Sequence, residues 1–315
     1  MKKRIKAQFS PLRLVMALTL VLLFALPALL QPTHASRAAW RQPLARAADP
    51  APVPPAFAIN GTPIRSTVRQ VVSQAAGTEI QLTPISQGLN NPQGLDHHQP
   101  SNKLVVLVNG WPGQPCRLQL VGADGTRADF GEADRSLLSA SMVAVRQALA
   151  GFKPGELFLE TRVPGVIARI PSDGSSVQNS WAVLPKERAL VSGGLCMDTT
   201  GLFDGELIAV TAQGRVWRIN SRGGARLIID LETPAQGVAI VPDDADKYGE
   251  WAGKLLVGDP LQGGVHAVAP HGQAAFYRLG ISPKDIDLIA ADENLFAVDG
   301  KEGTLYTAPA SALRG

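Results

Sequence analysis

The stretch Arg117-Leu118-Gln119-Leu120-Val121, followed by the turn Ala123-Asp124-Gly125, decides the fold because a similar strand and turn recur along the chain. Three later turns each follow a short apolar strand: Ser172-Asp173-Gly174, Ser221-Arg222-Gly223 and Pro270-His271-Gly272. The four glycines, at positions 125, 174, 223 and 272, lie 49 residues apart each time. A repeat of about 40 to 50 residues that holds several short strands predicts one blade of a β-propeller per repeat.

Alignment of the repeats on these turns predicts four strands in each. The strands before the turns are 117–121, 166–170, 215–219 and 265–268. One strand further in, near-continuous apolar runs indicate burial on both faces, at 104–108, 156–160, 206–210, 254–257 and 295–298. The innermost strands begin at Gly94, Met142, Gly194, Gly237 and Ile286. An ordinary β-sandwich is the alternative, but its strands have no reason to keep one period.

The two ends of the repeat region complement each other. The segment Glu79–Ile85 reads as a strand that precedes the first repeat, and the last repeat ends at 305–308 without an outermost strand. Pairing the two closes the ring and removes an exposed sheet edge. We therefore predict an all-β propeller of four-stranded blades, with five blades and a ring closed by an N-terminal strand. A sixth blade stays open as an alternative.

The first 77 residues differ in composition from the repeats. Residues 1–35 combine a basic start, an apolar run over 14–30 and a small residue at Ala35, which predicts a signal peptide. An uncleaved anchor is the alternative. Residues 36–77 form a proline-rich linker or arm, and residues 78–315 form the propeller domain. We therefore expect a secreted or surface-tethered protein whose mature part has no transmembrane helix.

Charge and cysteine usage exclude some functions. The leader contains Lys2, Lys3, Arg4, Lys6 and Arg13 and no acidic residue, so the net charge of +3 becomes −2 without it. A mature domain without a basic cluster is not expected to bind nucleic acid. The two cysteines, Cys116 and Cys196, fall on an outer strand and an innermost strand of different repeats, which is too far apart for a disulfide.

Several motifs carry a family resemblance. Gly88–Leu95, followed by an apolar strand, resembles the NHL-type and TolB-like propellers, which include the gluconolactonase-related hydrolases. Motifs in the second half resemble an uncharacterised group of exported bacterial propeller proteins, namely 203–208, 214–219, 236–242, 248–254 and 285–289. The resemblance covers residues 78 to 313 and implies a propeller fold and export. It leaves the function open.

One acidic segment partly matches a calcium loop. Asp244, Asp246 and Gly249 occupy positions 1, 3 and 6 of such a loop, but Tyr248 and Leu255 stand where two oxygen ligands are needed. A solvated acidic turn is the interpretation that we favour, and the two aspartates remain weak metal candidates.

The central channel is the other place where polar residues gather. Asp285 and Asp287 lie at the same phase of one innermost strand, where they could meet Asp96 and Asn91. The resemblance to TolB-like hydrolases implies a divalent ion at this place. The equivalent positions of other repeats are apolar or a thiol, as at Val143, Cys196 and Ala239, which is a poor ligand set. We assign no cofactor and leave a divalent cation open.

Our leading hypothesis is therefore a binding or interaction scaffold. Its ligand would be a polar small molecule, a glycan or a peptide outside the cytoplasm, bound by the longer loops between blades: 88–93, 135–141, 186–193, 232–236 and 281–285. The predicted ligand-binding residues are Asn90, Asn91, Asp96, Gln236, Asp285 and Asp287. The alternative is a metal-dependent hydrolase or lactonase that acts in the channel, so whether the protein is an enzyme stays open.

Overall fold

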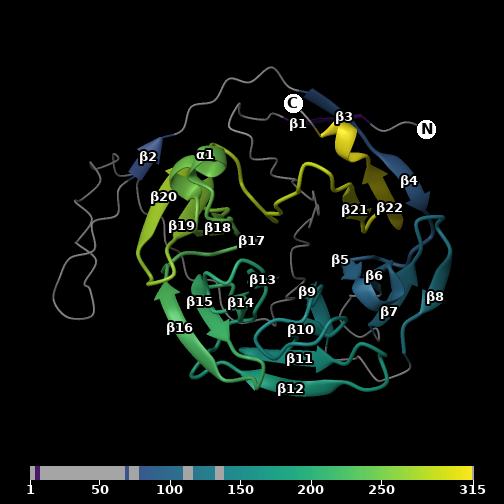
Figure 1. Cartoon of the computed structure of the whole chain (residues 1–315), viewed down its shortest axis with the longest axis horizontal. Coiled ribbons are helices and arrows are strands. Elements are labelled where there is room, and N and C mark those ends of the chain that lie inside the picture. Colours follow the sequence, from purple (N-terminus) through teal and green to yellow (C-terminus); the bar gives the residue numbers. More distant parts are fainter. Residues whose placement is uncertain (1–3, 8–67, 71–77, 109–115, 132–137, 314–315) are drawn as a thin grey trace, which may run out of the picture. The chain divides into compact units, whose positions relative to one another are not determined.

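The structure, a computed structural model, describes residues 4–7, 68–70, 78–108, 116–131 and 138–313. The chain divides into two units, and all of the described residues belong to the unit made of Met1–Val21 and Ser66–Gly315. In this unit five blade sheets form a ring, so the predicted all-β propeller of five blades is confirmed (Figure 1). Most of the predicted leader and linker lies outside the described residues.

Blades 1 to 3 each consist of four antiparallel strands in chain order, with the first strand nearest the centre of the ring (Figure 1). Blade 1 contains β5 (Gly94–His98), β6 (Lys103–Val108), β7 (Arg117–Val121) and β8 (Arg127–Asp129). Blade 2 contains β9 (Leu138–Ala144), β10 (Leu157–Thr161), β11 (Val166–Ile170) and β12 (Gln178–Val183). Blade 3 contains β13 (Gly194–Met197), β14 (Leu207–Val210), β15 (Arg215–Ile219) and β16 (Ala225–Asp230).

Blade 4 has an additional strand on its outer edge. Its four regular strands are β17 (Val238–Ile240), β18 (Leu255–Asp259), β19 (Gly264–Val268) and β20 (Ala274–Arg278), with the short helix α1 (Ala245–Tyr248) between the first two. The fifth strand, β2 (Val68–Gln70), pairs in parallel with β20. Part of the predicted arm therefore lies along the side of the propeller.

Blade 5 closes the ring. It contains β21 (Leu295–Asp299), β22 (Thr304–Ala308) and β4 (Thr83–Ser86), and β4 pairs antiparallel with β22 so that Ser86 lies opposite Leu305. The predicted closure by an N-terminal strand is thus confirmed. The preceding strand β3 (Thr78–Gln81) pairs instead with β1 (Arg4–Ala7).

The innermost strand expected at Ile286 is not a regular strand. The backbone N–H of Ile286 donates to Oδ1 of Asp285 at 2.9 Å, so a side chain takes the hydrogen bond that a strand ladder would use. Ile286 nevertheless packs with the blade 4 core, where it is 3% exposed. The segment therefore occupies the innermost place of blade 5 with a single bridge residue, Leu288, in place of a continuous strand.

The repeated glycines explain how neighbouring blades fit together. Gly125 and Gly223 have φ values of +80° and +83°, which side chains other than glycine rarely adopt. A Cβ at Gly125 would lie 2.1 Å from the carbonyl oxygen of Ile85, and one at Gly223 would lie 2.3 Å from that of Trp181. Each turn thus packs against the outermost strand of the preceding blade, and the turn of blade 1 makes this contact with β4 of blade 5.

The hydrophobic core lies between the blades, as the apolar runs predict. Strands β10, β14 and β18 are buried along their whole length. One cluster joins Phe158 and Trp181 of blade 2 to Trp217 of blade 3. Burial of such large side chains is the main favourable contribution to the stability of the ring.

The two ends of the ring carry different connections because successive strands alternate in direction. We call the end with the repeated turns between third and fourth strands the hairpin end; it also holds the links between first and second strands. We call the opposite end the loop end. It holds the blade-to-blade loops and the hairpins between second and third strands. In the described part of the chain, no helix has the length and apolar character that a membrane crossing requires.

Candidate ligand-binding site

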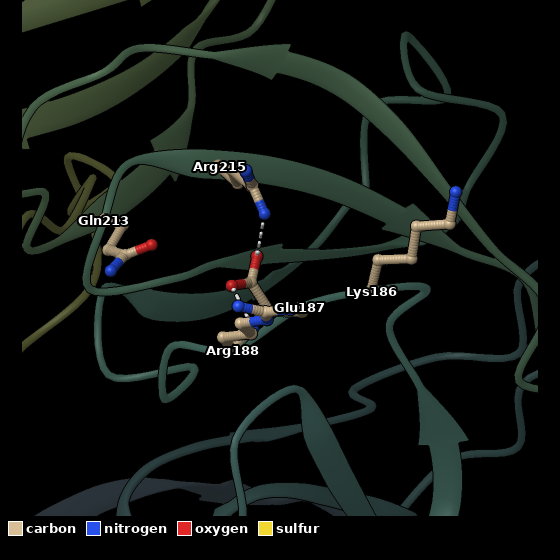
Figure 2. A pocket seen from close by; sticks show the side chains of 5 residues that line it. All are labelled: Lys186, Glu187, Arg188, Gln213 and Arg215. Carbon is tan, nitrogen blue, oxygen red and sulfur yellow. Dashed lines mark hydrogen bonds and ion pairs between the residues drawn. The ribbon is translucent and has the colours of Figure 1, made fainter.

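A cavity of about 580 Å³ lies at the loop end where blades 2 and 3 meet (Figure 2). Lys186, Glu187 and Arg188 line it from the loop between β12 and β13. Gln213 and Arg215 line it from the hairpin between β14 and β15. The cavity therefore lies on one of the inter-blade loops that the sequence predicts for ligand binding.

Glu187 fixes the floor of this cavity. Its Oε1 accepts hydrogen bonds from the backbone N–H groups of Arg188 at 2.8 Å and Ala189 at 2.9 Å. Its Oε2 lies 3.7 Å from Nη1 of Arg215, and Figure 2 shows the carboxylate between the two arginines. The Glu187 side chain is fully covered, yet no donor among the described residues hydrogen-bonds to Oε2. The carboxylate therefore orders the loop.

Arg215 is held in place by two carboxylates. Its Nε donates to Oδ2 of Asp230 at 2.8 Å, in addition to the contact with Glu187. The hydrogen bond and the charge of Asp230 raise the pKa of Arg215, with a smaller contribution from Glu187. The guanidinium thus stays charged and points into the cavity at a defined place.

Lys186 and Arg188 are the two cations that remain open to a ligand. Both residues are exposed, and in the described part of the chain neither the ammonium nor the guanidinium has a hydrogen bond or ion pair. Lys186 also adopts a φ of +58°, which is uncommon outside glycine. Strained backbone of this kind is enriched at ligand sites. With Arg215, these side chains give the cavity three positive charges against the one of Glu187.

The predicted residue Asp96 lies on β5 and faces the channel. Its Oδ2 accepts from the backbone N–H of Ala144 at 2.8 Å, and its Oδ1 accepts from His97 N–H at 2.6 Å. Nη2 of Arg146 lies 3.3 Å from Oδ1, and Nη1 of the same arginine lies 3.5 Å from Glu293. Asp96 therefore links blades 1 and 2.

Asp287 belongs to the same channel cluster. Limited hydration within the ring raises the pKa of Asp287 to about 6, although the residue itself has exposed surface. The charge of Arg146 opposes this shift, and the charges of Asp96 and Glu293 add to it. The structure thus brings Asp96 and Asp287 together, as expected, and groups them with an arginine and a glutamate that the sequence did not point to.

The other predicted residues lie at the loop end but not in this cluster. Asn90 and Asp285 are exposed. The Oδ1 atom of Asn91 accepts from Gln93 at 3.0 Å, while its Nδ2 is buried with no hydrogen-bond partner among the described residues. The Oε1 atom of Gln236 is likewise buried with no hydrogen-bond partner among the described residues. A binding role for these residues stays a prediction.

The weak metal candidates have a local structural role. Asp244 caps α1, where its side chain accepts from the backbone N–H of Lys247 at 3.1 Å, and Asp246 is exposed on the same helix. Across the described ranges, no three His, Cys, Asp or Glu side chains converge closely enough to hold a metal ion. The channel does not provide the ligand set that the family resemblance implies, so the described residues do not fit a metal centre there.

The cysteines and histidines add no reactive group to the channel. Cys116 and Cys196 are not joined by a disulfide. Burial raises the pKa of the Cys196 thiol to about 12, so it stays protonated. Nε2–H of His98 donates to the carbonyl oxygen of Ser172 at 3.0 Å, Nδ1 lies 2.9 Å from Ser101 Oγ, and burial lowers the pKa of the imidazole. His98 therefore serves the contact between blades 1 and 2 as a neutral imidazole.

The sequence predicts the loop 186–193, which lines the cavity, as a binding loop, but it does not point to Gln213 or Arg215. Both lie on a second-to-third-strand hairpin, and such hairpins end at the same face as the inter-blade loops. A search for charged residues at that face would have found Arg215. Arg146 and Glu293 lie instead in links between first and second strands, at the hairpin end, where a search for charged residues would have found them.

Comparison with known proteins supports the fold alone. No protein-family model matches the sequence, and no curated protein matches it. Among solved structures, a putative gluconolactonase is similar with a TM-score of 0.53 and 11% identity, over 72% of this chain and 91% of the other. A virginiamycin B lyase from Staphylococcus aureus has a TM-score of 0.46 and 11% identity, over 72% and 73% of the two chains. A gluconolactonase from Xanthomonas campestris has a TM-score of 0.45 and 15% identity, over 73% and 89%. The likeness to the first of these structures, the one with a TM-score above 0.5, is consistent with the β-propeller fold.

Proposed function

We propose that the protein is an exported β-propeller that binds an anionic group in the cavity between blades 2 and 3. The leader-like residues 1–35 and the proline-rich residues 36–77 support export, with the propeller secreted or tethered at the cell surface. The ligand class includes polar small molecules, glycans and peptides that carry a carboxylate or another anion. The protein would act by binding rather than by turnover.

The observation that supports this function is the charge of the cavity. Two arginines and a lysine line it, and only Arg215 is engaged by carboxylates of the described residues. Arg188 can offer a planar, bidentate pair of donors to a carboxylate, and Lys186 can add a point charge. Hydrogen bonds to charged groups each contribute about 1.5 to 3 kcal/mol. Gln213 provides a neutral amide that can select among anions.

Binding of small anions tests the proposal. Isothermal titration of the full chain with gluconate and glucuronate should show saturable binding, whereas glucose, which lacks the charge, should bind far more weakly. Arg188→Ala should weaken anion binding about tenfold because a charge-assisted pair is lost.

Arg226→Ala is the matched control. Arg226 is also an exposed arginine of blade 3, with its side chain 61% exposed, but it lies at the hairpin end and pairs with Asp204. This variant should bind gluconate like the parent. Equal loss in both variants, or anion binding that survives loss of both Lys186 and Arg188, would place the ligand elsewhere.

A hydrolase that acts in the channel is the second candidate function. The observation that favours it is Asp287, whose pKa of about 6 would let the carboxyl take up or release a proton near neutral pH. Arg146 could hold the developing negative charge of an ester or lactone oxygen. The metal-dependent form of this activity has no support in the described residues, which offer no three-ligand group. Hydrolysis of gluconolactone that disappears in Asp287→Asn would establish the channel as a catalytic site.

A further inference from the structure

Two exposed aliphatic residues lie in loops that border the basic cavity. Val163 and Leu190 are 42% and 36% exposed, and both lie in loops at the loop end. Isolated exposed aliphatic side chains need no explanation, but these two lie beside a cavity whose Lys186 and Arg188 have no ion-pair partner among the described residues. We define the rim surface as Val163, Lys186, Arg188 and Leu190.

Backbone hydrogen bonds join the parts of the rim surface into one unit. The N–H of Gly165, in the hairpin that carries Val163, donates to the carbonyl oxygen of Ala189 at 2.9 Å. The carbonyl oxygen of Leu190 accepts from Ala212 N–H at 2.8 Å. The backbone of the loops that carry Val163 and Leu190 is therefore fixed relative to the cavity, so a ligand that contacts both parts needs no rearrangement of this backbone.

The size and chemistry of the rim surface favour a ligand larger than a single anion. A cavity of about 580 Å³ lies within the range of small-molecule sites, and one carboxylate fills only a part of it. The neighbouring aliphatic side chains can contribute only if the ligand carries apolar groups beside its charge. An extended peptide does so, since its side chains leave the backbone at regular intervals.

Charge argues against a lipid surface at this place. Membrane attachment needs a broad apolar face or a cluster of several basic residues, whereas the rim surface offers two aliphatic side chains and two unpaired cations. The chain after the leader also has a net charge of −2, which disfavours anionic membranes as a whole. A small positive site on a protein with a net negative charge instead favours a partner whose negative charge is confined to a short segment.

We infer that the rim surface docks an acidic, aliphatic segment of a partner protein, with a glutamate or aspartate side chain in the cavity and a leucine-like or valine-like side chain against Val163 and Leu190. This inference rests on the proposed function and names the chemical class of its ligand. The carboxylate binds between Arg188 and Lys186. The adjacent aliphatic group replaces water on Leu190.

A labelled peptide tests the inference. A short fluorescein-labelled peptide in which glutamate alternates with leucine should bind the full-length protein saturably by fluorescence anisotropy. Two matched peptides separate the contributions, one with glutamine for glutamate and one with serine for leucine, and each should bind about tenfold more weakly.

Protein variants locate the peptide. Arg188→Ala and Leu190→Ser should each weaken peptide binding about tenfold, whereas gluconate binding should weaken about tenfold in the first variant and stay unchanged in the second. Val163→Thr keeps the shape of the side chain and replaces one methyl group with a hydroxyl, so it should weaken binding of the leucine peptide without affecting gluconate binding. Leu261→Ser is the control, because Leu261 is 75% exposed at the loop end of blade 4, away from the rim surface.

The outcomes separate this inference from the proposed function. Gluconate binding without saturable peptide binding overturns the inference and leaves the proposed function standing. Binding of phosphatidylglycerol vesicles that depends on Arg188 and Leu190, with no peptide binding, also overturns it, since a lipid surface would then be the partner. Absence of binding to gluconate, peptide and vesicles overturns both proposals. Equal loss of peptide binding in Leu261→Ser and Leu190→Ser shows that the peptide binds elsewhere.

Discussion

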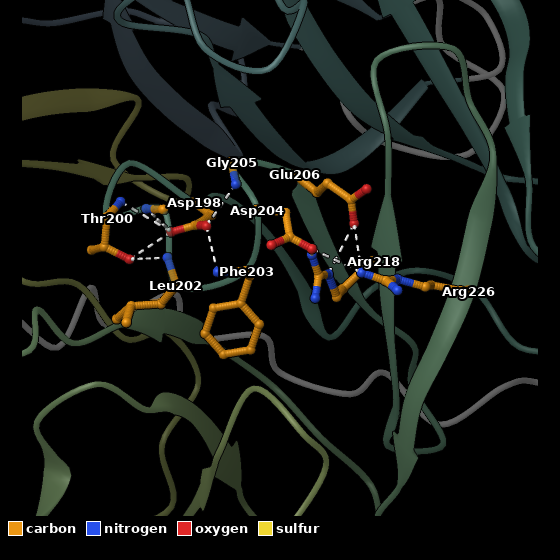
Figure 3. Close-up of polar contacts among 10 residues, drawn as sticks. Asp198, Thr200, Leu202, Phe203, Asp204, Gly205, Glu206, Arg218 and Arg226 are labelled. Atoms are coloured by element: carbon orange, nitrogen blue, oxygen red, sulfur yellow. Dashed lines mark hydrogen bonds and ion pairs between the residues drawn. The ribbon is translucent and has the colours of Figure 1, made fainter.

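The two ends of the ring use charged side chains in different ways. At the hairpin end of blade 3, the buried carboxylate of Asp198 accepts hydrogen bonds from the backbone N–H groups of Thr200, Gly201, Phe203 and Gly205 (Figure 3). It also accepts from the hydroxyl of Thr200 at 2.6 Å. Every oxygen of this carboxylate is therefore engaged, and the carboxylate organises the link between β13 and β14.

Arg218 completes the hairpin end of the same blade. Its guanidinium pairs with Asp204 and Glu206, and Figure 3 shows it between these two carboxylates. Blade 2 repeats the arrangement, since Arg169 on β11 pairs with Glu156 at the start of β10. At the loop end, by contrast, Lys186 and Arg188 have no such partners in the described part of the chain.

This difference separates charges that hold the fold from charges that are open to a ligand. A buried charge with all its partners is part of the fold, because removing one partner leaves the others desolvated and unpaired. An exposed charge without partners contributes little to folding, and its interaction energy remains for a ligand. We therefore expect substitutions at the hairpin end to change stability and substitutions at the loop end to change binding.

The largest effect is expected for Asp198→Ala. The substitution leaves the buried N–H groups of Phe203 and Gly205 without acceptors, so the free energy of unfolding should fall by about 4 kcal/mol. Urea denaturation followed by tryptophan fluorescence measures this loss. Asp246→Ala, an exposed aspartate on α1, is the control and should change stability by less than about 0.5 kcal/mol. Similar losses in both variants would remove the distinction between the two kinds of charge.

Two glycines, one at each end of the ring, allow the two ends to be compared through the backbone instead of through charged side chains. Gly223→Ala should reduce the free energy of unfolding by about 3 kcal/mol, because the added Cβ would lie 2.3 Å from the carbonyl oxygen of Trp181 and the φ is +83°. Gly280 has a similar φ of +72°, but a Cβ there would meet nothing within 4 Å. Gly280→Ala should therefore cost about 1 kcal/mol, the conformational part alone. Thermal and urea unfolding of both variants would contradict this account if Gly280→Ala were the less stable.

Much of the fold could be predicted from the sequence because the repeat acts through local chemistry. The predicted strands 117–121, 166–170 and 215–219 coincide with β7, β11 and β15, since apolar alternation and a glycine turn bound each of them. The closure of blade 5 followed from the need to remove an edge. The prediction of a regular innermost strand at Ile286 was wrong. The backbone N–H of Ile286 donates to the side chain of Asp285, and the sequence pattern does not show that side-chain conformation.

The site was less predictable than the fold. Asp96 and Asp287 could be placed in one channel from strand phase, but the cavity at Glu187 and Arg215 depends on how two blades approach each other. No local pattern encodes that distance. The strained backbone of Lys186 also had no signal, since a lysine at φ +58° looks like any other solvent-exposed lysine in the sequence.

Substitution of Asp287 should have an effect on stability that is intermediate in size and depends on pH. Its pKa is raised from the ordinary 3.8 to about 6 in the folded protein, so between these values the unfolded chain releases a proton that the folded protein keeps. Ionisation of Asp287 therefore lowers the free energy of unfolding as the pH rises from 4 to 6. Asp287→Asn removes this contribution, and the melting temperature of the variant should rise relative to the parent over that range and level off above it.

NMR titration of the Asp287 carboxyl group measures the same effect directly, with a midpoint near pH 6. Arg146→Met should raise the midpoint because the opposing positive charge is lost, and Asp96→Asn should lower it because a neighbouring negative charge is lost. A midpoint near 4 that neither variant moves would show that the channel cluster is as well hydrated as the surface.

The smallest effect on stability is expected for Arg188→Ala. Because Arg188 is exposed and its guanidinium has no partner among the described residues, its loss should change the free energy of unfolding by less than about 0.5 kcal/mol. Arg218→Ala is the matched substitution at the hairpin end; it removes the 2.9 Å hydrogen bond to Glu206, which keeps only a 3.8 Å contact with Arg226, and should cost about 2 kcal/mol. Gluconate binding should show the reverse order, weakened about tenfold in Arg188→Ala and unchanged in Arg218→Ala. Urea unfolding measures the stability of both variants, and titration calorimetry measures their affinity for gluconate. If Arg188→Ala were the less stable variant, or if Arg218→Ala were the one with weakened gluconate binding, the two ends would not differ in the way that we propose.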